Sequence, residues 1–499
     1  MGTLVASARI FKEAGLKPRP GQVEAAEGVA KALDEGLSVV FVAPTGFGKT
    51  LAVLAGLKAS QHLPALWLIR SLEIGRRISG DALLLGLRPF VAAGRARTCP
   101  LAEKLGEAIH EWCKTNRAKC RYYLDLLRRG IDVSAALSWQ DLLGSGVCPY
   151  YAQDLAAKEA DIVIQSYYRR PYPASAAVVD EAHNLLAPRV RRLSVKVFAE
   201  AAAELRALGR IDLAEEALRL ASTSKHVPLE RLPLLELEDA VREALERLKA
   251  VRGLIRLTRA VRTCQKGGAA YRESWSDVVE VYEPPWRPQT RPVVYVSATM
   301  PEGLEGLLGA EATIRVPPQR RLGAYVTSWL TTRFGEETWR GYAKLLTVLK
   351  FRFRKVLAFA TERVAIHLLS SVDLYEPELD RPPRDWKGVL LLHIRGRFAE
   401  GVDLPADCVI VLGCPFLPPE VTRRLRRFYE RAGCSDAAFW APMVIVTLQA
   451  VGRATRSPEH EPVIVLADER FQRYADKFHP HLELIEISSP NHIKGRRHA

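Results

Sequence analysis

Residues 43–50, Ala-Pro-Thr-Gly-Phe-Gly-Lys-Thr, have the composition and the setting of a phosphate-binding loop. The segment follows an apolar run at 39–42 and precedes residues of helical composition, which is the strand–loop–helix context that such a loop needs. Small residues let backbone N–H groups close around phosphate oxygens, and a helix N-terminus adds positive potential. We expect Lys49 to reach the β- and γ-phosphates and the Thr50 hydroxyl to ligate Mg²⁺. The expected nucleotide-binding residues are Ala43, Pro44, Thr45, Gly46, Phe47, Gly48, Lys49 and Thr50.

A second motif, Asp180-Glu-Ala-His, supplies the groups that hydrolysis of a nucleoside triphosphate needs. The apolar residues 177–179 predict a buried strand that ends at two carboxylates, and α/β sheets bind ligands at the carboxyl ends of their strands. We expect Asp180 to hold Mg²⁺ and Glu181 to orient and deprotonate the attacking water, because phosphoryl transfer depends on positioning and charge neutralisation. The alternative is a pair of exposed loop acids beside an unrelated glycine-rich turn.

The C-terminal half contains cations at helical spacing. Gln449, Arg453 and Arg456 fall on one face of a predicted helix. Two guanidinium groups so placed can clamp the oxygens of a transferring phosphoryl group as arginine fingers. A solvated helix face is the alternative.

Two further segments are expected to contact the nucleotide away from its phosphates. Glycines bracket the loop 396–405, in which we expect Gly401 and Asp403 to bind, with Asp403 at the ribose or its water shell. Upstream of the phosphate loop, Arg19-Pro-Gly-Gln22 is expected to read an adenine edge through the Gln22 amide.

The composition favours a nucleic-acid partner. Lys and Arg number 72 against 57 Asp and Glu, a net charge of 72 − 57 = +15, and a basic surface attracts polyanions. Enrichment of basic residues in a thermophilic source is another explanation, and only three Asn and three Met occur. No apolar stretch approaches the roughly 20 residues that span a bilayer. We therefore expect a cytoplasmic protein whose eight cysteines are not structural disulfides.

Alternating apolar runs and helical segments predict an α/β fold with parallel sheets. The pattern breaks at 95–150, which has four cysteines and no convincing strand, and again at 190–288, which is mostly helical in pattern. Pro317-Pro318 reads as a hinge, after which a second α/β unit follows. We expect two similar motor domains, the first interrupted twice: 1–92, 153–189 and 289–318 form the first domain, 93–152 and 190–288 are insertions, and 319–499 is the second domain.

The ordered motifs resemble those of superfamily 2 helicases across nearly the whole chain, and specifically the XPD-like branch that carries an iron–sulfur cluster. The resemblance is carried by Arg19/Gln22, 43–50, Arg70-Ser71, Asp180-Glu-Ala-His, Ser297-Ala-Thr, the 396–403 loop and Gln449 to Arg456. After Arg70 the chain departs from the branch, with Ser-Leu-Glu-Ile in place of a more polar sequence. The resemblance implies that both motor domains are RecA-like. It also implies an ATP-dependent DNA helicase with 5′→3′ polarity and a role in DNA repair.

Cys99, Cys113, Cys120 and Cys148 are spaced by 13, 6 and 27 residues. Zinc sites usually show paired gaps of two to four residues, whereas a [4Fe–4S] cluster accepts thiolates from well-separated segments. Cys148-Pro-Tyr-Tyr and the segment before Cys99 are similar to the branch's ligand sequences. We expect an iron–sulfur domain at 93–152 and, as the resemblance implies, an arch domain at 190–288; zinc or free thiols are the alternatives.

The expected protein is a monomeric motor that uses ATP, Mg²⁺ and a [4Fe–4S] cluster to walk on single-stranded DNA and open forked duplex, near the nucleoid of a prokaryotic thermophile. A translocase that clears bound proteins without unwinding would carry the same ATP motifs. An RNA helicase would share them too, although the four cysteines and the long gap before Ser297 argue against it. A non-enzymatic damage-recognition module would not need the complete set Lys49, Asp180, Glu181 and Arg453.

Overall fold

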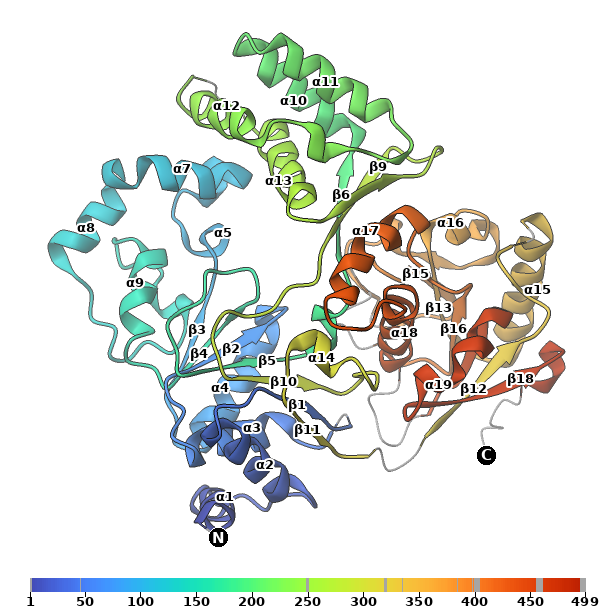
Figure 1. Cartoon of the computed structure of the whole chain (residues 1–499), viewed down its shortest axis with the longest axis horizontal. Coiled ribbons are helices and arrows are strands. Elements are labelled where there is room, and N and C mark those ends of the chain that lie inside the picture. The colour runs from blue at the N-terminus through green and yellow to red at the C-terminus, as the bar shows by residue number, and fades with distance from the viewer. Residues whose placement is uncertain are drawn as a thin grey trace.

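The chain folds into two α/β lobes with two insertions beside and above them (Figure 1). The computed structural model describes residues 2–44, 46–247, 251–317, 321–333, 335–383, 385–396, 398, 404–454 and 461–493. No helix in these ranges is long and apolar enough to cross a membrane. The expected fold class, two parallel-sheet domains of α/β type, is confirmed.

The N-terminal lobe is built on a seven-stranded sheet in which every pairing is parallel, in the order β11-β1-β10-β5-β2-β4-β3. Parallel strands covered by helices on both faces read as continuous apolar runs, which is why 39–42, 65–69 and 177–179 were recognisable as strands. The strands are β1 (Val39–Val42), β2 (Ala65–Ile69), β3 (Pro89–Ala92), β4 (Ile162–Ser166), β5 (Ala176–Val179), β10 (Val293–Ser297) and β11 (Ala312–Arg315).

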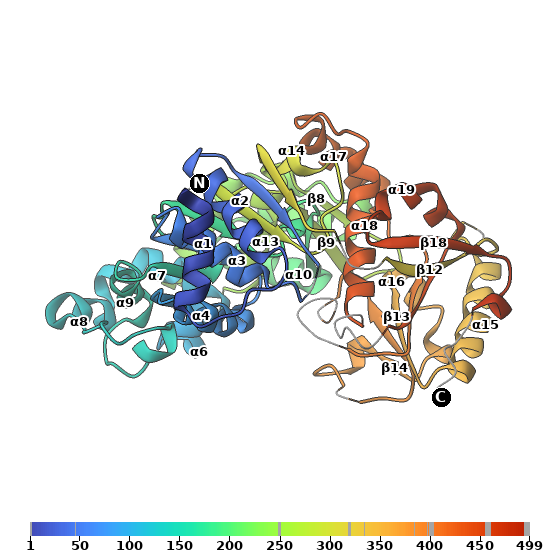
Figure 2. The ribbon, with the colours of Figure 1, turned by 90° about the horizontal axis from the view of Figure 1, so that it is seen from below.

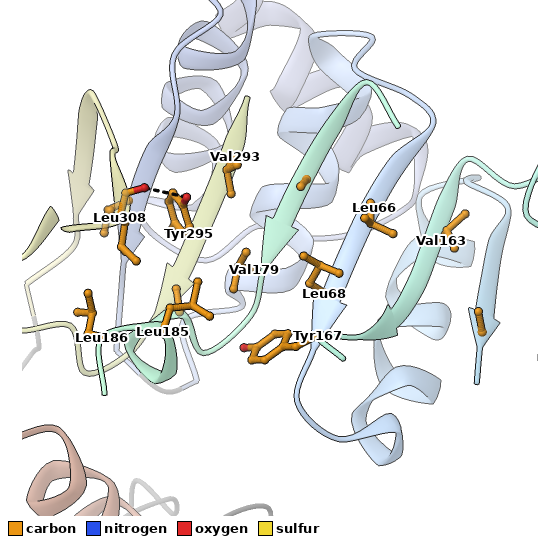
Figure 3. Close-up of a cluster of buried hydrophobic side chains, with 14 of the residues drawn as sticks. Leu66, Leu68, Val163, Tyr167, Val179, Leu185, Leu186, Val293, Tyr295 and Leu308 are labelled. Atoms are coloured by element: carbon orange, nitrogen blue, oxygen red, sulfur yellow. Dashed lines mark hydrogen bonds between the residues drawn. The ribbon is translucent and has the colours of Figure 1, made fainter. Parts of the chain in front are cut away.

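Two apolar layers hold this sheet. One face packs on α1 (Gly2–Glu13), α2 (Gln22–Asp34), α3 (Lys49–Ala59) and α4 (Gly75–Leu84). The other face presents Leu66, Leu68, Val179 and Val293 toward residues that follow the strands, among them Tyr167 and Leu186 (Figure 3). Tyr295 reaches across this layer and donates a hydrogen bond of 2.9 Å to Leu308 O, next to the short helix α14 (Glu305–Leu308).

The C-terminal lobe repeats the plan with a second seven-stranded parallel sheet, in the order β14-β15-β13-β16-β17-β12-β18. Its strands are β12 (Leu322–Thr327), β13 (Lys355–Ala360), β14 (Leu374–Tyr375), β15 (Gly388–His393), β16 (Cys408–Leu412), β17 (Val463–Ala467) and β18 (Leu482–Ile487). Its helices are α15 (Glu336–Arg352), α16 (Glu362–Ala365), α17 (Pro419–Glu430), α18 (Ala437–Gly452) and α19 (Ala475–Phe478). Figure 2 shows α18 at the boundary between the lobes.

The first insertion, residues 93–152, leaves the sheet after β3 and contains no strand. It consists of helices and 3₁₀ turns around α5 (Arg95–Thr98), α6 (Ala102–Leu105), α7 (Ile109–Asn116), α8 (Arg121–Arg129) and α9 (Pro149–Ala156). The chain then re-enters the sheet at β4.

The second insertion, residues 190–288, has four longer helices and, unexpectedly, an antiparallel sheet in the order β6-β9-β8-β7. β6 and β9 mix charged and apolar residues, and they pair although they are far apart in the chain, so they give no continuous apolar run. The elements are β6 (Arg189–Ser194), α10 (Val195–Ala207), α11 (Ile211–Ser222), β7 (Lys225–His226), α12 (Leu234–Arg247), α13 (Gly253–Gln265), β8 (Ala269–Arg272) and β9 (Val278–Glu283).

Candidate functional site

The loop after β1 is wound tightly around its own lysine. Gly46 and Gly48 adopt positive φ angles of 85° and 87°, which L-residues with side chains rarely adopt. Lys49, the first residue of α3, donates from Nζ to Ala43 O at 2.9 Å and to Pro44 O at 3.1 Å. Burial lowers the pKa of Lys49, while the nearby Glu181 and Asp180 act in the opposite direction. The ammonium therefore lies in the loop and beside the acidic motif, where a phosphate would meet it.

Gln22 braces this loop from behind. Its Nε2 donates to Gly48 O at 3.1 Å, and its Oε1 accepts from Arg19 N at 2.6 Å. A Cβ at position 48 would lie 2.1 Å from Gln22 Nε2, so a larger residue would displace this amide and would also be strained at the positive φ. Both ends of the amide thus contact backbone. A cavity of about 310 Å³ opens beside them, lined by Phe11, Leu16, Lys17, Arg19, Gln22, Gly48, Thr50, Leu51, Arg77 and Asp81.

Asp180 and Glu181 lie at the carboxyl end of β5, next to β10 and in the same sheet as β1. Asp180 Oδ1 accepts from Glu181 N at 3.0 Å, and Glu181 has a left-handed φ of 50° that turns its side chain out of the strand direction. Burial raises the pKa of Asp180 to about 7, Glu181 adds to the shift, and Lys49 opposes it. Two adjacent carboxylates facing one lysine form a site that a divalent cation would complete, with Thr50 on the neighbouring helix.

The Ser297-Ala-Thr segment meets the acidic motif through a histidine. His183 Nδ1 lies 2.8 Å from Ser297 Oγ, 3.2 Å from Thr299 Oγ1 and 3.5 Å from Glu181 Oε2. Burial lowers the pKa of His183 to about 4, so the ring is neutral near pH 7. The hydroxyls at the end of β10 are therefore in direct contact with the motif that carries the metal and base candidates.

Residues of the C-terminal lobe face this motif across the boundary. Gln449 Nε2 donates to Asn184 Oδ1 at 2.8 Å. Arg453 directly follows α18, is 8% exposed, and its charge helps to lower the pKa of His183. Gln449 and Arg453 are thus brought to Asp180-Glu-Ala-His. The predicted site residues Thr45, Gly401, Asp403 and Arg456 lie outside the described residues.

Sequence reasoning missed Asn184, which Arg70 Nη1 also contacts, at 2.7 Å. The available signal was its place directly after the acidic motif, as one of only three asparagines in the chain.

The four clustered cysteines come from separate segments of the first insertion. Cys99 follows α5, Cys113 lies in α7, Cys120 precedes α8 and Cys148 precedes α9. Burial raises the pKa of Cys148 to about 11, and Cys99 and Cys120 act in the same direction, so these thiols are neighbours.

Other groups around the cysteines oppose this shift. Hydrogen bonds from the backbone of Tyr151 and Tyr150 favour the Cys148 thiolate, and Arg95 favours that of Cys99. These donors and the gathering of thiols suit an anionic thiolate set. In the described part of the chain, however, no three Cys, His, Asp or Glu side chains have the spacing of a metal site.

A larger cavity of about 500 Å³ lies between the second insertion and the C-terminal lobe. Cations and rings alternate on its walls, as in grooves that bind single-stranded nucleic acids. Arg470 Cζ, for example, stands 5.4 Å from the centroid of the Phe416 ring. Three glutamates also line the cavity. The other cations and rings on its walls include Arg192, Arg333, Arg363, Arg473, Tyr271, Trp275, Trp339 and Phe439.

Known proteins resemble this chain over nearly its full length. The helicase C-terminal domain family matches residues 379–483. The ATP-dependent DNA helicase XPD of Sulfolobus acidocaldarius is 22% identical over 547 residues, covering 92% of this chain and 97% of the relative.

Solved structures give the same picture of the fold. An XPD helicase structure superposes with a TM-score of 0.69 at 20% identity, covering 94% of this chain and 100% of the other. The structure of S. tokodaii Xpd4 gives a TM-score of 0.60 at 19% identity, with the same coverage. The chain is thus similar to XPD helicases in sequence and shares their fold, and its residues 379–483 match the helicase C-terminal domain family.

Proposed function

We propose that this protein is an ATP-driven DNA helicase that translocates 5′→3′ on a single strand and unwinds duplex. One observation carries the proposal: Gln449 and Arg453 of the C-terminal lobe lie against the Asp180-Glu-Ala-His motif of the other lobe. A nucleotide bound at this boundary would touch both lobes, so that its hydrolysis can change how they sit together.

In the proposed cycle the N-terminal lobe holds the nucleotide. The 43–50 loop binds the phosphates, and Lys49 exchanges its carbonyl partners Ala43 O and Pro44 O for phosphate oxygens. Thr50 and Asp180 would hold Mg²⁺, which neutralises charge on the phosphates. The cation would favour ionisation of Asp180, whose pKa burial and the nearby Glu181 raise to about 7.

Hydrolysis needs a positioned water and a cationic clamp. Glu181 orients the water and takes its proton, and the neutral His183 links this carboxylate to the Ser297 and Thr299 hydroxyls. Arg453, together with Arg456, stabilises charge on the transferring phosphoryl group from the opposite side. Gly401 and Asp403 are assigned to the ribose side, and Arg19 with Gln22 to the adenine side.

DNA as the track is supported by the net charge of +15 and by the cavity of arginines and rings between the second insertion and the C-terminal lobe. The curated relative is named an ATP-dependent DNA helicase. The polarity and a place in DNA repair rest on the resemblance to the XPD-like branch. We further propose that the protein acts as a monomer inside a prokaryotic, thermophilic cell.

We propose that Cys99, Cys113, Cys120 and Cys148 hold a [4Fe–4S] cluster. The support is that Cys99 and Cys148 each have other thiols of this set nearby, and that backbone donors favour the Cys148 thiolate. The cluster would cross-link four segments of an insertion whose helices are mostly short, and so keep the insertion rigid beside the N-terminal lobe.

The decisive test is ATP hydrolysis with and without single-stranded DNA, paired with opening of forked duplexes that carry a 5′ or a 3′ tail. We expect Lys49→Ala to lower turnover by on the order of 100-fold or more while DNA binding persists. Lys31→Ala, on the exposed side of α2, is the matched control and should behave as the wild type. Unchanged turnover in Lys49→Ala would refute the site.

The same assays separate the alternatives. Stimulation by single-stranded DNA without duplex opening would indicate a translocase that clears bound proteins. Stimulation by RNA alone would indicate an RNA helicase, and DNA binding without any ATP turnover would indicate a recognition module.

A further inference from the structure

Asn184 joins three parts of the molecule, and the proposed function gives this residue no role. It lies in the 3₁₀ turn η5 (Ala182–Leu185), directly after the acidic motif. Its Oδ1 accepts two hydrogen bonds: from Arg70 Nη1 at 2.7 Å and from Gln449 Nε2 at 2.8 Å. One oxygen atom thus joins the end of β2, the end of the acidic motif and the last turn of α18.

The positions of the two donors, Arg70 and Gln449, determine what the hydrogen bonds to Asn184 hold in place. Arg70 directly follows β2, which pairs with β5 and so is fixed relative to Asp180. Gln449 stands one helical turn before Arg453, on the same side of the helix. Holding Gln449 at Asn184 therefore sets where the Arg453 guanidinium lies relative to His183 and the acidic pair.

We propose that Asn184 is a positioning residue for ATP hydrolysis: its Oδ1 fastens Arg70 and Gln449 together and thereby places Arg453 against the nucleotide. The role rests on the proposed function, because it concerns the same reaction. In this role Asn184 acts through Gln449 and Arg453, so its loss slows the chemical step and leaves nucleotide binding to the N-terminal lobe.

The chemistry of the junction dictates the substitutions. Both hydrogen bonds use an acceptor oxygen, which aspartate retains and leucine, of similar size, lacks. Asn184→Leu leaves one charged and one neutral donor without this partner at a half-buried site, whereas Asn184→Asp keeps both bonds and strengthens the one to Arg70.

The experiment measures kcat and KM for ATP in the wild type and the variants. We expect Asn184→Leu to lower kcat about 10-fold with less than about a 2-fold change in KM, and Asn184→Asp to stay within about 3-fold of the wild type. The double variant Asn184→Leu/Gln449→Leu should be no slower than the slower single variant, because both changes break the same contact.

The matched control is Asn491→Leu. Asn491 Oδ1 accepts from Arg352 Nη2 at 3.1 Å, so this variant also removes an asparagine–arginine bond, but far from the lobe boundary. It should leave kcat and KM unchanged, which separates positioning from a general loss of stability.

Three results would overturn the inference: wild-type kcat in Asn184→Leu, an Asn184→Asp variant as slow as Asn184→Leu, or effects of the two leucine variants that multiply. If the wild type hydrolyses ATP and any of these three results is found, the role of Asn184 is refuted while the proposed function stands. A wild type without ATP turnover refutes the proposed function and, with it, a role for Asn184 in hydrolysis. Non-additive shifts in melting temperature would then still report the Asn184–Gln449 contact.

Discussion

The C-terminal lobe meets the rest of the molecule through two contacts of different chemistry. At the boundary with the N-terminal lobe, hydrogen bonds join uncharged groups: Gln449 bonds Asn184, and the buried Tyr429 donates to Leu186 O. Arg453 adds one charge there, close to His183. Buried apolar residues of α17 and α18 join the same core as Met300 and Leu304 of the N-terminal lobe. This contact is therefore mainly apolar and changes little with ionic strength.

The contact with the second insertion adds half-exposed ion pairs to apolar packing, in which Ala269 and Tyr282 share a buried core with α17. Arg424 of α17 pairs with Glu230, and Arg192 of β6 lies 3.5 Å from Glu362 of α16. Side chains of the Arg424–Glu230 pair are 33% and 24% exposed. Such pairs contribute about 0–1 kcal/mol each and weaken in salt.

The far side of the second insertion is held in the same way. Arg256 and Arg259 of α13 pair with Glu107 and Glu111 of the first insertion. Charge pairs thus link the second insertion to both the first insertion and the C-terminal lobe. Under the proposed function, the lobe boundary would serve hydrolysis, and the ionic contacts would serve the handling of the DNA strand.

The largest expected effect separates two arginines of the C-terminal lobe. Arg453→Ala should lower ATP turnover about 1,000-fold, because removal of an arginine finger leaves the developing phosphoryl charge without its partner. Arg424→Ala, at the ionic contact, should keep DNA-independent turnover within about 2-fold of the wild type. Steady-state ATPase rates at saturating ATP make the comparison, and equal losses in both variants would contradict it.

A second variant weakens the contact between the first and the second insertion. Cys148→Ser should abolish absorbance at about 400 nm and loosen the first insertion, on which Glu107 and Glu111 depend. Duplex opening should fall at least about 10-fold, while DNA-independent ATPase stays within about 2-fold. Cys264→Ala, a buried cysteine of α13, is the control and should keep both the absorbance and the iron content. An unchanged spectrum in Cys148→Ser would rule out the proposed cluster.

Elements that depend on local sequence could be predicted, whereas elements that depend on distant contacts could not. Central strands such as β1, β2 and β16 were predictable, because burial on both faces gives a continuous apolar run. The loop after β1 and the acids after β5 were placed at strand ends by the same reasoning.

Features that depend on distant pairing were not predictable. β14 has only two residues, and β18 reads Leu-Glu-Leu-Ile-Glu-Ile. Neither therefore gives the continuous apolar run that predicts a buried strand. The antiparallel sheet of the second insertion pairs β6 with β9, which are far apart in the chain. Asn184 gained its partners only through folding, since Arg70 and Gln449 are 114 and 265 residues away.

A charge reversal tests the ionic contact directly. Arg424→Glu places like charges together and should slow duplex opening about 2- to 5-fold, the effect that a pair contributing up to about 1 kcal/mol allows. Adding Glu230→Arg should restore most of the rate by rebuilding the pair. Arg426→Glu disturbs only a pair within α17, with Glu430, and is the control. The difference between Arg424→Glu and wild type should shrink as salt rises; a double variant no faster than the single one would contradict the assignment.

The smallest expected effect concerns His393, at the end of β15 beside the ionic contact. Burial lowers its pKa to about 4, the charge of Arg192 acts in the same direction, and Nε2 lies 2.9 Å from the Tyr375 hydroxyl. Because an unfolded histidine titrates near about 6.5, the unfolded chain binds the proton more readily. The stability from the neutral ring is therefore present above about pH 6.5 and is lost as the pH falls toward 4, by at most about 3 kcal/mol.

His393→Gln keeps a polar partner for Tyr375 but cannot be protonated. Its melting temperature should fall less steeply than that of the wild type between pH 6.5 and 4, whereas His367→Gln, at an exposed position on the same lobe, should leave the slope unchanged. Because protonated His393 would repel Arg192, the loss should be accompanied by easier proteolysis of the second insertion before the lobe boundary opens. If the protease cuts the second insertion and the lobe boundary at the same time at every pH, the ionic contact and the lobe boundary do not differ in the way their chemistry requires.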